Sequence, residues 1–132
     1  MNKHPNDKDF QIESGKIFVF GSNLAGIHGA GAARFARDKL GALPGKAAGR
    51  MNQSYAIPTK DENLETLPLD AIQHFVTNFI AYARCQPDVQ FFVTRIGCGL
   101  AGYSDEDIAP MFVDAPANCE LPIGWDPLEK TR

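Results

Sequence analysis

The chain has 132 residues, of which 44% are hydrophobic and 22% charged, a composition typical of one compact globular domain and unlike that of a disordered chain. A formal net charge of -3, with no run of Lys or Arg, argues against a nucleic-acid-binding patch, and no stretch has the form of a membrane span or a secretory signal. Because neither kind of segment is found, we expect a cytoplasmic protein without membrane contact. The three cysteines form neither a C-x-x-C pair nor a metal-ligand cluster with histidine, so we expect free thiols and no metal, and no cofactor is expected either.

The N-terminal part of the chain predicts an arm, a strand and a short helix. Residues 1–15 are polar and predict a flexible arm ahead of the core. The apolar run at residues 16–20 is typical of a fully buried strand. Residues 32–40, closed by Gly41, predict a helix that follows a glycine-rich segment.

The middle of the chain carries the clearest helix signal. Residues 41–52 are rich in glycine and have no period, so they predict a loop. Residues 54–57 predict a second strand, which Pro58 ends. Residues 68–84 place apolar side chains at the spacing of an amphipathic helix.

The C-terminal part predicts a further strand, helix and strand. Residues 89–94 are a strand, Ser104 caps a helix, and residues 118–121 are a final strand, ahead of a polar tail at residues 126–132. Strands that alternate with helices predict a mostly parallel sheet covered on both faces, in a single domain that spans residues 16–125.

Two glycine-rich segments follow predicted strands: the first glycine loop (residues 23–33) and the second glycine loop (residues 96–102). In an open α/β sheet, ligands bind beyond the carboxyl ends of the strands, which is where both loops fall. The small residues from Gly29 to Ala33 let backbone N–H groups approach an anion at the start of a helix. The alternative is that these residues only allow the helix to pack tightly on the sheet.

The starts of the two helices that follow these loops differ. The helix after Ser104 has a capping hydroxyl and acidic residues in its first turn, whereas the helix after Gly31 has neither. A helix start without cap or acid is either exposed to water or reserved for a ligand phosphate. Together, the two loops favour the ligand.

The second glycine loop matches the dinucleotide motif G-x-G-x-x-G and has Glu120 further along the chain. Only residues 103–132 remain after it, however, which is too short for the two βαβαβ halves of a dinucleotide-binding fold. We therefore interpret it as a second phosphate-binding turn and not as an NAD site. The prediction is a diphosphate-containing nucleotide held between the two loops.

Three segments resemble the macrodomain family of ADP-ribose-binding modules: Asn23 to Ala33, Ile57-Pro58-Thr59-Lys60, and Arg95 to Leu100. Their order and spacing are most similar to the branch that removes terminal ADP-ribose from glutamate side chains. The resemblance implies a three-layer α/β/α fold with a mostly parallel mixed sheet, and ADP-ribose or an ADP-ribosylated protein as the partner. The ligand-binding residues expected from the loops and from the resemblance are Asn23, His28, Gly29, Ala30, Gly31, Ala32, Ile96, Gly97, Cys98, Gly99, Leu100, Ala101, Gly102 and Tyr103.

The resemblance also implies a catalytic pair, which is incomplete in this chain. In that branch a lysine after the middle strand attacks the anomeric carbon of the distal ribose, and an aspartate just beyond the second loop's Gly-Leu assists. Lys60 matches the lysine, but the aspartate position falls on Ala101, and the nearest acids in sequence are Asp61 and Asp105. Lys60 is therefore a nucleophile with a displaced acid, a phosphate-pairing group or a surface lysine. ADP-ribose binding is predicted, and ADP-ribosyl hydrolase activity is left open.

Three further side chains have two interpretations each. His28 either binds a phosphate or ribose or packs against Ile27, and Asn23 either contacts the distal ribose or makes a turn. Cys98 is a nucleophile or a space-filling residue. Tyr103 follows the second glycine loop and is expected to stack on a ribose or purine face. The alternative function for the whole chain is a non-catalytic protein-interaction or assembly component that retains the fold.

Overall fold

The computed structural model describes residues 15–99 and 101–125 of the chain. Residues 1–14 of the expected arm, Leu100 and the expected tail at residues 126–132 lie outside these ranges. Within them, five strands form one sheet in the order β2-β3-β1-β4-β5. All neighbouring pairs are parallel except β2 and β3, so the mostly parallel mixed sheet is confirmed. The strands are β1 (Ile17–Asn23), β2 (Gly49–Met51), β3 (Ser54–Lys60), β4 (Phe91–Val93) and β5 (Cys119–Glu120).

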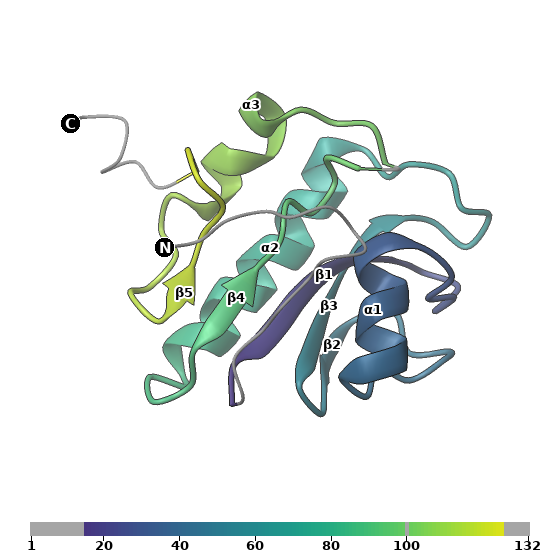
Figure 1. Ribbon diagram of the computed structural model, residues 1–132. Helices are drawn as coiled ribbons and strands as arrows, with labels where there is room; N and C mark the ends of the chain where they lie inside the picture. The colour runs from purple at the N-terminus through teal and green to yellow at the C-terminus, as the bar shows by residue number, and fades with distance from the viewer. Residues whose placement is uncertain (1–14, 100, 126–132) are drawn as a thin grey trace.

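Helices cover both faces of this sheet, as Figure 1 shows. Alternate side chains of β1 point to opposite faces: Ile17 and Val19 join the cluster under α2, while Phe18 and Phe20 join the cluster under α1. The three-layer α/β/α arrangement follows from these two cores. The helices are α1 (Gly31–Lys39), α2 (Leu69–Arg84) and α3 (Asp105–Ile108), which continues into the 3-10 turn η1 (Ala109–Phe112).

The α2 helix buries the stripe that its sequence period predicts. Its fully or nearly buried residues are Ile72, Val76, Phe79, Ile80 and Ala83, at the spacing of one helical face. They pack with the β1 and β4 side chains and with η1 into the larger core cluster. No helix within residues 15–99 and 101–125 is long and apolar enough to cross a membrane.

Two local predictions are wrong. Pro58 does not end its strand, because β3 continues to Lys60. The antiparallel neighbour β2 pairs only with Ser54, Tyr55 and Ala56, so Pro58 lies beyond it, where a residue without an N–H is tolerated. The segment predicted as a loop at residues 41–52 contains β2, whose short Gly-Arg-Met sequence carries no strand period.

Candidate functional site

A pocket of about 550 Å³ opens where the loops that follow β1, β3 and β4 meet. Figure 1 shows these loops at the carboxyl edge of the sheet. Its volume lies within the range of small-molecule sites, roughly 300–1,000 Å³. Both glycine loops contribute to its wall, together with the ends of β1 and β3. The lining residues are Gly21, Ser22, Asn23, Ile27, Gly29, Ala30, Gly31, Ala32, Ala33, Thr59, Lys60, Leu64, Thr94, Arg95, Ile96, Gly97, Cys98, Gly99 and Ala101.

The start of α1 forms one side of this pocket. Ala30 precedes the helix in an extended conformation and makes no side-chain cap, and the first turn holds no acidic residue. By contrast, α3 follows Ser104, whose backbone N–H and hydroxyl both donate to the Asp107 carboxylate at 3.1 Å, and its first turn holds three acidic residues. The predicted difference between the two helix starts is confirmed. The N-terminal N–H groups and the helix dipole of α1 are therefore directed toward a space that can hold an anion.

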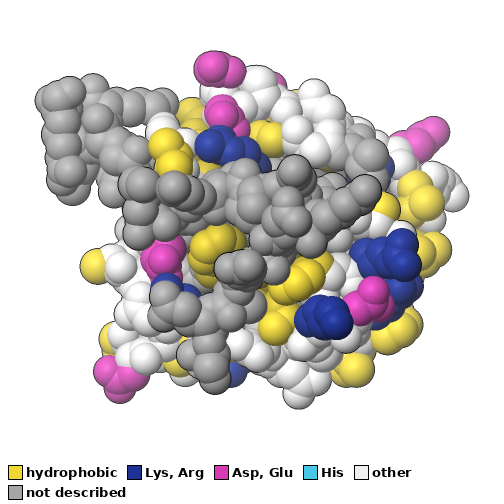
Figure 2. All heavy atoms as spheres, viewed as in Figure 1, with side chains coloured by type: hydrophobic (Ala, Val, Ile, Leu, Met, Phe, Trp, Pro, Cys, Tyr) yellow, Lys and Arg dark blue, Asp and Glu magenta, His cyan; other side chains and the backbone are white. Residues whose placement is uncertain are grey.

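The charged side chains of the pocket are of one sign. Lys60 and Arg95 line it, whereas no Asp or Glu is among the lining residues within the described part of the chain. The basic side chains gathered over α1 in Figure 2 belong to the outer face of the helix, where Arg34 and Arg37 pair with Asp38. Because Arg95 forms an ion pair with Asp105, it is Lys60 that acts together with the α1 dipole, and the pocket favours a negatively charged ligand.

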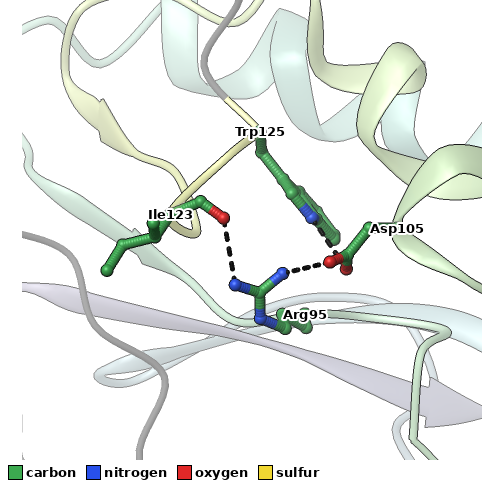
Figure 3. Close-up of polar contacts among 4 residues, drawn as sticks. All are labelled: Arg95, Asp105, Ile123 and Trp125. Carbon is green, nitrogen blue, oxygen red and sulfur yellow. Dashed lines mark hydrogen bonds and ion pairs between the residues drawn. The ribbon is translucent and has the colours of Figure 1, made fainter. Parts of the chain in front are cut away.

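Arg95 is held in place by a set of contacts that brackets the second glycine loop (Figure 3). Its guanidinium donates to Asp105 Oδ2 at 2.7 Å and to the Ile123 carbonyl at 3.0 Å. The other carboxylate oxygen of Asp105 accepts from the indole Nε1 of the buried Trp125 at 3.0 Å. Because Arg95 precedes the loop and Asp105 follows it, this ion pair joins the two ends of the loop. We name these three residues the Arg95–Asp105–Trp125 brace.

The pKa of Asp105 is lowered by this brace. Burial raises it, but the hydrogen bonds from Trp125 and Arg95 and the charge of Arg95 outweigh burial. Because the folded-state pKa lies below the unfolded value of about 3.9, the carboxylate stabilises the fold above that pH. This contribution is lost as the pH falls through the folded-state pKa.

Replacing Asp105 with asparagine is therefore expected to lower the melting temperature at pH 7. Because half of this side chain is exposed, the loss should not exceed about 1 kcal/mol. The difference from wild type should shrink as the pH falls below about 4, where the carboxyl of the unfolded chain becomes protonated, and should vanish below the lowered folded-state pKa. Melting curves from pH 2 to 8 measure this difference, with Glu106→Gln as the control, because Glu106 is exposed in the same helical turn. A difference independent of pH would contradict the role of the charge.

In the first glycine loop, Asn23 has a structural role. Its amide accepts a hydrogen bond from the Ile27 N–H at 3.0 Å and donates to the Ile27 carbonyl at 2.8 Å. Asn23 lines the pocket, but both ends of its amide are used to close the loop. The turn interpretation therefore accounts for its contacts.

His28 lies behind the first glycine loop and is not among the residues that line the pocket. It is 2% exposed, its Nε2 lies 3.0 Å from the Leu43 carbonyl, and its ring meets the edge of Phe20. Since a carbonyl can only accept, Nε2 carries the proton. His28 joins the loop to the segment after α1, and its position does not support direct contact with a ligand.

The remaining predicted residues of the second glycine loop divide between the pocket and its surroundings. Ile96, Gly97, Cys98, Gly99 and Ala101 line the pocket; Gly102 and Tyr103 do not. The hydroxyl of Tyr103 donates to the Leu67 carbonyl at 2.7 Å, which directs the ring toward the start of α2 and does not support stacking on a ligand.

Cys98 lines the pocket as a neutral thiol. Burial, together with the neighbouring Asp105 carboxylate, raises its pKa to about 12. A thiolate nucleophile is therefore disfavoured at neutral pH, and the space-filling interpretation accounts for the residue.

Neither of the two acids considered as substitutes for the missing aspartate lines the pocket. The Asp61 carboxylate accepts backbone hydrogen bonds from Asn63 at 2.8 Å and Glu65 at 3.0 Å, within its own turn. Both oxygens of Asp105 are used in the Arg95–Asp105–Trp125 brace. Of the residues that the structure describes, Lys60 therefore lines the pocket and no carboxylate does.

Several lining residues were not among the predicted site residues. Thr59 and Thr94 donate their hydroxyls to the Ser22 and Val19 carbonyls, which ties the ends of β3 and β4 to β1. Their position at strand ends on one sheet edge could have indicated them. Ile27 and Leu64 carried no such signal, because exposed aliphatic residues in loops are common.

Comparison with known proteins assigns no family to the chain. No protein-family model matches the sequence, and no curated protein matches it. Among solved structures, a protein of unknown function from Bacteroides thetaiotaomicron is similar, with a TM-score of 0.55 and 19% sequence identity over 79% of this chain and 82% of that chain. At this identity the likeness supports the α/β fold alone.

Proposed function

We propose that this protein binds ADP-ribose, or a closely related diphosphate nucleotide, in the pocket between the two glycine loops. One observation carries the proposal: the pocket joins the uncapped start of α1, two glycine loops and the cation of Lys60, and no carboxylate is among its lining residues in the described part of the chain. Phosphates are bound in proteins by this combination of free backbone N–H groups, helix dipole and basic side chains. The resemblance of three segments to macrodomains supports ADP-ribose as the nucleotide.

Turnover is not part of the proposal. The glutamate glycohydrolase chemistry implied by the resemblance needs a lysine nucleophile and a carboxylate that manages protons and the developing positive charge. Lys60 lines the pocket, but Ala101 offers only a methyl group, and Asp61 and Asp105 are held by other partners. We therefore assign Lys60 to phosphate pairing.

A thermal-shift titration tests the proposal. ADP-ribose at 100 times its Kd should stabilise the fold by about 2.7 kcal/mol and raise the melting temperature by several degrees. AMP, which has one phosphate and one ribose, should produce a smaller rise. Absence of any shift or calorimetric heat at millimolar ADP-ribose would contradict the proposal and favour a protein-interaction component that retains the fold.

Lys60→Ala is expected to weaken ADP-ribose binding by roughly 10- to 150-fold, because one charge-assisted contact of roughly 1.5–3 kcal/mol is lost. Lys39→Ala is the matched control, since Lys39 is exposed in the last turn of α1, at the end away from the pocket. Calorimetric titration measures both variants. Wild-type protein incubated with a substrate that carries ADP-ribose on a glutamate side chain should release no ADP-ribose. If the wild type releases ADP-ribose and Lys60→Ala does not, the protein is a hydrolase.

A further inference from the structure

Two large aliphatic side chains line the pocket and keep much of their surface exposed. Ile27, in the first glycine loop, is 55% exposed, and Leu64, in the turn between β3 and α2, is 47% exposed. No aromatic side chain is among the pocket-lining residues of the part of the chain that the structure describes. Apolar surface inside a ligand pocket is available to pack against an apolar part of the ligand.

Leu64 has an unusual backbone conformation. Its φ of 63° lies in the left-handed region, which a leucine rarely adopts. Four hydrogen bonds around Asp61 hold the turn. The Leu64 N–H donates to the Asp61 carbonyl, and the Asp61 N–H donates to the Glu65 carbonyl. The Asp61 carboxylate accepts from two further backbone N–H groups in the turn. A residue kept in a disfavoured conformation at a ligand pocket points to a functional constraint on its side chain.

The turn that carries Leu64 is also fixed to the rest of the pocket. Thr66 pairs with Lys60 through a β-bridge, and its hydroxyl donates to the Ala101 carbonyl of the second glycine loop at 2.9 Å. Figure 1 shows this turn, between β3 and α2, on the same edge of the sheet as the first glycine loop. The position of Leu64 is therefore set relative to Lys60 and to the second glycine loop.

We propose that Leu64, together with Ile27, makes the pocket selective for organic diphosphate esters over inorganic anions. The two aliphatic side chains pack against a ribose or base of the ligand, while Lys60 and the start of α1 bind its phosphates. This inference rests on the proposed function. Inorganic pyrophosphate carries the charge but no ring, so it gains nothing from the aliphatic surface and binds more weakly than ADP-ribose.

Leu64→Asn tests the inference. Asparagine is close to leucine in size and tolerates the left-handed conformation, so the variant should fold with an unchanged or higher melting temperature. Loss of the apolar contact should weaken ADP-ribose binding about tenfold and leave pyrophosphate binding unchanged. Leu43→Asn is the matched control, because Leu43 is also exposed, at 52%, and lies outside the pocket lining. Ile27→Thr, which keeps the branched Cβ, should give a smaller loss of ADP-ribose affinity.

The outcomes separate this inference from the proposed function. If the wild-type protein binds no ADP-ribose by calorimetry, the proposed function fails and the inference fails with it. If the wild-type protein binds ADP-ribose and Leu64→Asn binds it equally well, only the selectivity of Leu64 is overturned. An equal loss of ADP-ribose and pyrophosphate binding would also overturn it, because the change would then act on the phosphate site.

Discussion

Replacing Gly26 with alanine is expected to lower the free energy of unfolding by about 3 kcal/mol, the sum of left-handed strain and a backbone clash. A Cβ at this position would lie 2.5 Å from the carbonyl carbon and 2.6 Å from the Cα of Gly45. Gly26 also has a φ of 71°, which alanine disfavours. Because the obstructing atoms belong to the backbone, the first glycine loop must move away from the segment after α1.

Gly45→Ala provides the matched control for that prediction. Gly45 has a φ of 87°, yet an added Cβ would meet no heavy atom within 4 Å. It should therefore show only the conformational strain, about 1 kcal/mol. Urea unfolding of both variants measures the difference. Equal losses would show that the close approach of the two glycines contributes nothing to stability.

Replacing Gly99 with leucine is expected to separate ligand binding from folding. Gly99 lines the pocket, its φ lies outside the left-handed region, and a Cβ there would have no heavy atom within 4 Å. The fold should therefore accept the side chain with little change in melting temperature. The added bulk occupies space that the ligand needs, so ADP-ribose binding should weaken by roughly 3 kcal/mol, or about 100-fold in Kd.

The control for Gly99→Leu adds the same bulk elsewhere. Ala81→Leu places a leucine at an exposed position of α2, outside the pocket lining, and should leave ADP-ribose binding unchanged. Calorimetric titration and melting curves on both variants give the two readouts. A Gly99→Leu protein that binds ADP-ribose with wild-type affinity would exclude the second glycine loop from the ligand site.

Local patterns in the sequence account for much of the fold. The apolar period of α2, the buried run of β1 and the stops at Gly41 and near Pro87 identify those elements because each depends on neighbours within a few residues. The missed strand β2 depends instead on its partner β3, to which Gly49–Met51 pairs across a turn. The extension of β3 past Pro58 likewise depends on tertiary pairing, because β2 pairs with β3 only as far as Ala56.

The candidate site divides in the same way. The sequence of the two glycine loops and the absence of a cap on α1 were sufficient to predict an anion pocket. Alanine at position 101, where the resemblance implies an aspartate, was sufficient to show that the implied catalytic pair is incomplete. Tertiary packing decided the rest, because it joins residues far apart in the chain. His28 and Tyr103 make hydrogen bonds outside the pocket and do not line it. Asp105 binds Arg95 and Trp125, and Leu64 lies in the pocket wall.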